Sequence, residues 1–385
     1  MIAARGGPKA VHYGTRCVAP IPRVHHFTPP LLILLALGAP AAAQSPFATR
    51  ALNYSPAPGQ FVQNSQFNDP ARALGAPGIA GGLSAADNSK CVTLGGFGGT
   101  ITLGFDHSVY ANPHNPRRLD FIVFGNGFYV GGDPLRRHAE CGVIEVSRDD
   151  NHNGLADDTW YLIPGSHLSG PVAATTVTWN AATLNPAWIP PGRSGTWTIS
   201  GYQLPGAFGP SPIIVNALGT GAETLWGYAD LAPTLLLGDT TATNVVDDPG
   251  ADPAMFYTIP DDPLTVGISP GSGGGSAIAI RWAINPVTGT PANLDRIDFV
   301  RITTGINAVH PILGEISTEI SSVADVRPIY TPDWNLDGAV TVQDIFDFLS
   351  SWFAGIGENG GADYNGSSGT TVQDIFDFLS AWFGG

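Results

Sequence analysis

Residues 119–130 read LDFIVFGNGFYV, a run of aromatic and branched side chains typical of β-strands. Similar runs recur from residue 100 onward, and glycine, proline, asparagine and aspartate separate them: TITLGFD (100–106), GVIEVSRD (142–149), TWYLIPG (159–165), TTVTWN (175–180), GTWTISGY (195–202), AIAIRWAI (277–284), RIDFVRITT (296–304) and EISTEI (315–320). Many short strands joined by turns predict a mainly β domain over residues 44–327, folded as a jelly-roll-like β-sandwich. No segment between residues 45 and 327 has a convincing amphipathic helical pattern.

The composition supports the same fold class. The chain of 385 residues contains 49 glycines and 33 prolines, and only 13% of its residues are charged. Glycine and proline favour turns over long helices, so the composition is that of short strands with many connections.

The N-terminal segment has the features of a signal peptide. Residues 31–38, LLILLALG, form an apolar run that is too short to span a bilayer, and small residues follow at Ala41 and Ala43. We therefore expect residues 1–43 to be removed on export, leaving a protein that is secreted or held at the cell surface. No other run approaches the length of a membrane span, so we expect no membrane insertion of the mature chain.

The charge of the mature chain excludes some partners. The leader carries four basic residues and no acid, so its removal leaves 13 Lys and Arg against 32 Asp and Glu, a formal charge of −19. Such a surface repels phosphate backbones and anionic lipid and attracts cations, so we expect no nucleic-acid partner.

Two cysteines remain after the leader, Cys91 and Cys141. In an exported chain they are candidates for a disulfide, and the alternative is two separate buried thiols.

The C-terminal region contains an internal duplication. Residues 341–355, TVQDIFDFLSSWFAG, return as TVQDIFDFLSAWFGG at 371–385. Apolar residues at helical spacing predict two short helices that pack on each other through matching stripes: Val342, Ile345, Phe346, Leu349, Trp352 and Phe353, then Val372, Ile375, Phe376, Leu379, Trp382 and Phe383. A capping box is expected at the start of each helix, from Thr341 with Asp344 and from Thr371 with Asp374.

A calcium-loop pattern precedes the first helix. In DWNLDGAVTVQD (333–344), oxygen ligands fall at alternate positions of a tight loop and a carboxylate closes the loop at position twelve. The predicted ligands are Asp333, Asn335, Asp337, the carbonyl of Ala339, Thr341 and Asp344.

The second copy of the loop is weaker. DYNGSSGTTVQD (363–374) has lost one carboxylate, and its turn glycine is shifted by one residue. Its predicted ligands are Asp363, Asn365, Ser367 and Asp374, and the alternative is a remnant that holds no ion.

Two loop-helix repeats, aspartate at position twelve and a C-terminal location together resemble the type I dockerin module over about residues 331–385. The resemblance implies a calcium-dependent docking domain over residues 328–385. Its expected partner is a cohesin-like or cell-surface scaffold protein, and in that family the module often belongs to a polysaccharide-degrading enzyme.

Residues 149–158 begin like a calcium loop but do not end like one, because position twelve is Trp160. The predicted ligands are Asp149, Asn151, Asn153, the carbonyl of Leu155, and Asp157 or Asp158. The alternative is an Asx-rich turn at the tip of a hairpin. Residues 239–248, DTTATNVVDD, repeat the same skeleton with threonines in place of stronger ligands, which favours a plain turn there. The surrounding region, with LGGFGGTITLGFDH, DFIVFGNGF and NGLADDTWYLIPGS, is similar to uncharacterised bacterial cell-surface β-sandwich proteins.

Evidence for catalysis is weaker than evidence for calcium. The G-x-S-x-G match at residues 267–271 has Pro270 after its serine, so the amide that an oxyanion hole needs is missing. Glu140 and Glu145 are the best pair for a glycoside hydrolase, but they should lie on opposite faces of one strand. Tryptophans such as Trp160 could stack on sugars or fill the core.

The sequence therefore predicts an exported, calcium-binding, non-catalytic protein that is held at the cell surface or associated with polysaccharide. The alternative is a secreted O-glycosyl hydrolase that carries the docking module for polysaccharide breakdown.

Overall fold

The computed structural model describes residues 44–78, 81–134, 137–140, 142–164, 174–202, 228–263, 265, 267–304, 309–310, 314–315, 317–354, 361–367 and 369–384, together with Gly7, Ala10 and Gly14. Its contacts divide the chain into two units, Met1–Ala42 and Ala43–Gly385. Apart from three residues, the predicted signal peptide lies outside the described part. Among the described helices, none combines the length and the apolar character needed to cross a membrane.

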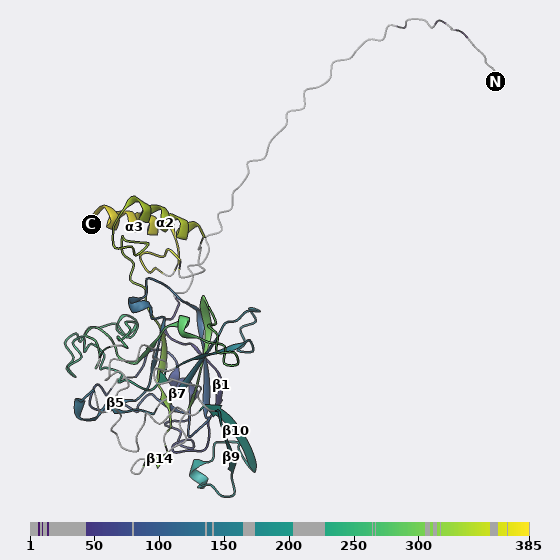
Figure 1. Ribbon diagram of the computed structural model, residues 1–385, viewed down its shortest axis with the longest axis vertical. Coiled ribbons are helices and arrows are strands. Elements are labelled where there is room, and N and C mark those ends of the chain that lie inside the picture. The colour runs from purple at the N-terminus through teal and green to yellow at the C-terminus, as the bar shows by residue number, and fades with distance from the viewer. Residues whose placement is uncertain are drawn as a thin grey trace. The chain divides into compact units, whose positions relative to one another are not determined.

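The second unit is mainly β with few helices, as predicted (Figure 1). The strands are β1 (Arg50–Ser55), β2 (Val92–Thr93), β3 (Thr100–Tyr110), β4 (Phe121–Phe124), β5 (Phe128–Tyr129), β6 (Arg137–His138), β7 (Gly142–Ser147), β8 (Trp160–Ile163), β9 (Ala174–Asn180), β10 (Thr196–Tyr202), β11 (Tyr228–Ala229), β12 (Ser276–Ile278), β13 (Arg296–Thr304), β14 (Val309–His310), β15 (Gly314–Glu315), β16 (Glu319–Ile320) and β17 (Ser322–Asp325). Short helices between them are η1 (Pro70–Ala73), η2 (Pro116–Arg118), η3 (Val130–Gly132), η4 (Pro186–Trp188), α1 (Pro253–Phe256) and η6 (Ile280–Trp282).

The largest sheet has six strands in the order β1-β3-β13-β7-β11, and β8 also pairs with β7. Its strands alternate between the core and the outer face. On β13, for example, Ile302 is buried while Arg301 and Thr303 face outward beside β3 and β7. The outward side chains of this part of β13 are therefore polar.

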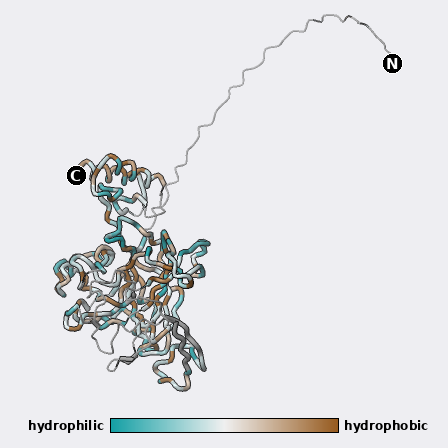
Figure 2. Tube along the Cα trace, viewed as in Figure 1, coloured by the Kyte–Doolittle hydropathy of each residue, from teal (hydrophilic) through white to brown (hydrophobic). Residues whose placement is uncertain are grey.

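A smaller sheet has the order β12-β4-β17, and further short strands pair as β16-β2, β5-β6, β9-β10 and β14-β15. Every pairing among the described strands is antiparallel. One hydrophobic cluster joins the two larger sheets, because it contains Leu103 and Ile144 from one sheet and Val123, Ile278 and Val323 from the other. Figure 2 shows the hydrophobic stretches of the trace gathered in the interior of the β region.

The C-terminal duplication forms two helices, α2 (Val342–Ala354) and α3 (Val372–Gly384), which lie side by side (Figure 1). Both predicted capping boxes form: Asp344 Oδ2 accepts from Thr341 N at 2.7 Å, and Asp374 Oδ2 accepts from Thr371 N at 2.7 Å. The helices therefore start where the sequence predicts.

The packing of these helices matches the predicted stripes in part, because six of their twelve members pack against the central cluster: Ile345, Leu349, Trp352, Ile375, Leu379 and Trp382. The two rings at the centre are Phe348 and Phe378, which are fully buried and stack with centroids 4.2 Å apart. Other members of the predicted stripes are exposed, with Phe346 at 60% and Phe353 at 71%. Trp334 and Tyr364, from the loops, complete the cluster around the phenylalanine pair. The helix contact is therefore centred on Phe348 and Phe378, and the edges that carry Phe346 and Phe376 stay exposed.

Candidate metal centres

The loop at residues 149–158 connects β7 to β8, which pair as an antiparallel hairpin with Ser147 opposite Trp160. Asp149 accepts hydrogen bonds from the amides of Asn153 (3.0 Å, to Oδ1) and Gly154 (2.8 Å, to Oδ2). Asn151 and Asn153 each accept an amide from two residues further along, at 3.0 and 2.7 Å. The loop is thus folded around its own predicted ligands, and Trp160 begins the outgoing strand.

The loop at residues 333–344 repeats this pattern. Asp333 accepts the amides of Asp337 (3.1 Å) and Gly338 (2.9 Å), Asn335 accepts that of Asp337, and Asp337 accepts that of Ala339. The backbone agrees too, because positions four and six are left-handed in both loops. The values of φ are 55° at His152 and 74° at Gly154 in one loop, and 59° at Leu336 and 92° at Gly338 in the other.

The loop at residues 363–374 keeps the first half of the pattern. Ser367 donates its amide to Asp363 and to Asn365, at 2.9 and 3.0 Å. Asp363 Oδ2 also accepts the amide of Gly369 at 3.0 Å. Ser368 lies outside the described residues. The contacts of Asp363 with the amides of Ser367 and Gly369 are therefore the described part of this loop.

The loop at residues 239–248 also has left-handed residues at positions four and six, and Asp239 accepts the amides of Thr243 and Asn244. Other polar groups of this loop form hydrogen bonds within the loop or with a neighbouring segment. Asp247 accepts hydrogen bonds from Thr240 and Thr241, and the Oδ1 atom of Asn244 accepts from the amide of Leu83. These contacts favour a plain turn over an ion site.

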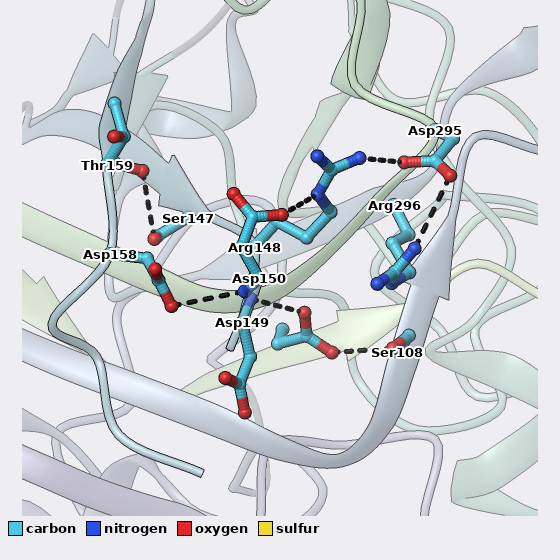
Figure 3. Close-up of polar contacts among 10 residues, drawn as sticks. Ser108, Ser147, Arg148, Asp149, Asp150, Asp158, Thr159, Asp295 and Arg296 are labelled. Atoms are coloured by element: carbon cyan, nitrogen blue, oxygen red, sulfur yellow. Dashed lines mark hydrogen bonds and ion pairs between the residues drawn. The ribbon is translucent and has the colours of Figure 1, made fainter. Parts of the chain in front are cut away.

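Asp157 and Asp158, the two candidates for the last ligand of the 149–158 loop, each accept a hydrogen bond from an earlier residue of the loop. The side-chain amide of Asn153 donates to both oxygens of Asp157, at 3.3 and 3.2 Å. Asp158 instead accepts the backbone amide of Asp150 at 3.1 Å, at the base of the loop (Figure 3). Asp157 is therefore the acid that contacts another predicted ligand. Figure 3 also shows Arg148 between Asp150 and Asp295, which ties the base of the loop to the neighbouring segment.

A second group of acids, which sequence reasoning missed, lies inside the protein. Glu140, Asp230 and Glu319 each offer one carboxylate oxygen, and these oxygens all lie within 4.8 Å of one another. The pairing of Ala229 with Gly142 brings the first two together, and Glu319 begins the strand that pairs with β2. Three such oxygens could hold a metal ion.

Burial dominates the electrostatics of this cluster. It raises the pKa of Glu319, and burial together with the negative charge of Glu319 raises the pKa values of Glu140 and Asp230 well above their usual range. Asp230 accepts the amides of Gly127 at 2.8 Å and Glu319 at 3.2 Å, and Ser317 Oγ donates to Oε1 of Glu319 at 2.6 Å. His138 lies 3.7 Å from Glu140. Three acids in one buried place need a proton or a cation to neutralise them.

No local spacing marks these three acids, because each comes from a different part of the chain. The available signal is weak: each acid lies in or beside a β-rich run, as in AECGVIEV, YADLA and STEIS. Glu140 was expected on the same strand as Glu145, but it precedes β7. Glu145 lies on β7 and forms a two-bond ion pair with Arg301, at 2.8 Å for each bond. The predicted hydrolase pair is thus divided between two different environments.

An open groove of about 600 Å³ lies on the outer face of the six-stranded sheet, next to the 149–158 loop. Thr100, Thr102, Glu145, Arg301 and Thr303 line its floor, and Leu155, Asp157 and Trp160 form part of its wall. The guanidinium of Arg301 lies 4.1 Å from the ring centre of Trp160. Trp160 therefore lies in the groove wall and not in the core.

Cys91 is buried and forms no disulfide. Cys141 lies outside the described residues. The predicted disulfide is therefore not formed, and Cys91 is a buried free thiol. Burial and the nearby charges of Asp230 and Glu319 raise the pKa of this thiol.

In comparisons with known proteins, the chain matched no family model and no curated protein.

Proposed function

We propose that the protein is an exported, calcium-binding, non-catalytic binding protein that acts at a cell surface or on polysaccharide. In this proposal a jelly-roll-like β-sandwich carries the binding surface, and a dockerin-like module at residues 328–385 attaches the protein to a scaffold. Residues 1–43 would direct export.

The observation that carries the proposal is the shared conformation of the loops at 149–158 and 333–344. In both loops the carboxylate of the first aspartate accepts hydrogen bonds from the amides at positions five and six. The side chains at positions three and five each accept the amide two residues further along. This folding leaves further lone pairs of the side-chain oxygens for a cation. Calcium suits such a set, because it takes six to eight oxygen ligands in flexible geometry.

The groove supports a role in binding. Its floor of threonines, a glutamate and an arginine, with Trp160 in the wall, offers hydrogen bonds and an aromatic surface of the kind that a sugar chain uses. Asp157 and Leu155 line the groove and belong to the 149–158 loop. An ion in that loop would therefore fix part of the groove wall.

The duplicated helices support a role in docking. Val342, Phe346 and Phe353 on α2 are exposed, and Val372, Phe376 and Phe383 are exposed at the matching positions of α3. Large apolar side chains left uncovered in two matching copies favour a protein partner, such as a cohesin-like or other cell-surface scaffold.

Counting bound calcium on the full chain tests the proposal. After equilibrium dialysis, Asp149→Ala and Asp333→Ala should each bind one ion fewer than the unmodified protein. Asp150→Ala is the matched control, because it removes the same charge from the loop at a position that the pattern does not use as a ligand. Equal calcium content in all four proteins would contradict the proposal.

A further inference from the structure

The buried acids Glu140, Asp230 and Glu319 have no role in the loops or the groove described above. A cluster of acids alone does not make a site, so its surroundings decide what it does. The side chain of Glu319 is the most informative, since this residue is only 6% exposed.

The carboxyl group of Glu319 lies within hydrogen-bond reach of that of Glu140, and one of its oxygens has no other described donor. Its Oε1 atom accepts from Ser317, which also bonds Thr93 at 2.7 Å, whereas its Oε2 atom is buried without a hydrogen-bond partner among the described residues. Glu319 also forms no ion pair with a described lysine or arginine. A buried carboxylate oxygen in this state is costly unless Glu140 donates a proton to it or a cation binds it.

The surrounding backbone is shaped to bring the acids together. A Cβ atom at Gly125 would lie 2.3 Å from Oδ1 of Asp230 and 2.7 Å from the carbonyl oxygen of Glu319. Only glycine lets the backbone pass this close to the carboxylate of Asp230. The amides of Gly127 and Glu319 then fix the orientation of that carboxylate.

We propose that Glu140, Asp230 and Glu319 form a buried calcium site that joins the ends of β7, β11 and β16. The three ligands are hard oxygen donors, which exclude a preference for soft thiophilic metals. Magnesium retains several of its waters and demands octahedral geometry, so a buried cluster of three carboxylates suits calcium better. The ion would also supply a partner for Oε2 of Glu319.

This site is separate from the loop sites, so it can be tested separately. In the full chain, Glu319→Gln should lower the number of bound calcium ions by one per molecule, measured by metal analysis after dialysis. Asp149→Ala should remove a different ion, so the double variant should lose two. If Glu319→Gln loses an ion and Asp149→Ala does not, the buried site stands while the proposed loop site fails.

Thermal unfolding distinguishes a ligand from a merely structural residue. In chelator, Glu319→Gln should melt at or above the temperature of the unmodified protein, because it removes one of three repelling acids. In millimolar calcium the order should reverse, and magnesium should not replace calcium. The control, Asp252→Asn, removes a carboxylate from the N-cap of α1, where asparagine caps equally well. It should retain the full calcium effect.

Glu140→Gln is a second variant in case Glu319→Gln does not fold, since the side chain of Glu140 is 12% exposed and less enclosed. It should show the same loss of one ion and the same reversal. The proposal is overturned if both folded variants bind as much calcium as the unmodified protein and gain as much melting temperature from it. That result would mean that the acids share protons and hold no ion.

Discussion

Asp149 and Asp333 each accept hydrogen bonds from the backbone amides four and five residues further along the chain. The equivalent distances in the two loops agree within 0.1 Å. One aspartate is in the tip of a β-hairpin, and the other precedes a helix. The loop conformation is therefore independent of the element that follows it. What differs is the acid predicted to close the site, which is Asp344 on the helix and Asp157 or Asp158 in the hairpin.

The first prediction concerns Asp149. Calcium should raise the melting temperature of the unmodified chain, since an ion that binds only the folded state stabilises it by about 2.7 kcal/mol at a hundredfold excess over the dissociation constant. The Asp149→Ala, Asp157→Ala double variant should lose the part of this gain that comes from the hairpin loop. Differential scanning calorimetry in calcium and in chelator measures it.

Asp239→Ala is the control for this experiment, because the loop at residues 239–248 has the same backbone, but other polar groups of this loop form hydrogen bonds within it or with a neighbouring segment. Calcium should raise the melting temperature of Asp239→Ala by as much as it raises that of the unmodified protein. An equal gain in the Asp149→Ala, Asp157→Ala variant would reduce the hairpin loop to an Asx-rich turn.

The second prediction compares the two loops of the C-terminal module. Asp333→Ala should reduce calcium-dependent helicity more than Asp363→Ala, because the second loop has one carboxylate fewer and its turn glycine is shifted by one residue. Metal binding supplies folding free energy to small domains with little core. Circular dichroism of the full chain, titrated with calcium after chelator, measures the difference in helical signal. Equal losses in the two variants would argue that the loops contribute equally.

Sequence predicted the parts of the structure that depend on local pattern. Most of the β-rich runs became strands, although AIAIRWAI continues from β12 into the short helix η6; Thr341 and Asp344 formed their capping box, and the loop at 149–158 connected a hairpin. These features follow from side chains that act on their own backbone neighbours. The metal ligands themselves and the jelly-roll-like sandwich stay predictions.

The features that sequence missed depend on contacts between distant segments. Glu140 and Asp230 meet only because β11 pairs with β7, and Glu319 joins them through a third strand. Likewise, helical periodicity alone did not place Phe348 at the centre of the module, where the loop residue Trp334 packs against it. The spacing of residues along one helix or strand does not reveal which side chains of another segment will pack against it.

The third prediction concerns the stacked pair at the centre of the module. Phe348→Ala should destabilise the module by about 3–5 kcal/mol, the usual cost of removing a fully buried phenylalanine. Phe346→Ala is the matched control two residues away on the same helix, and it should change stability little because the ring is 60% exposed. Denaturant unfolding in calcium, followed by helical circular dichroism, compares the two. Similar losses would mean that the exposed edge of the helix also carries packing energy.

The final prediction is a pH dependence set by His107, which lies on β3 between two carboxylates. Its Nδ1 atom is 2.8 Å from Asp106 and its Nε2 atom is 3.0 Å from Asp325 on β17, so the imidazole links the two larger sheets. Burial by itself would lower the pKa of His107, but the hydrogen bonds and charges of Asp325 and Asp106 outweigh it and raise the pKa above the ordinary value.

Because the folded-state pKa of His107 is raised, the folded protein holds this proton more tightly than the unfolded chain does. Its contribution to stability is therefore complete below the unfolded pKa of about 6.5 and disappears as the pH rises through the folded pKa. His107→Gln keeps a hydrogen-bonding side chain but does not titrate. The unmodified protein should lose more unfolding free energy than His107→Gln between pH 6 and pH 9, in urea titrations at fixed calcium. Parallel pH profiles for the two proteins would show that the imidazole is not protonated in the folded state.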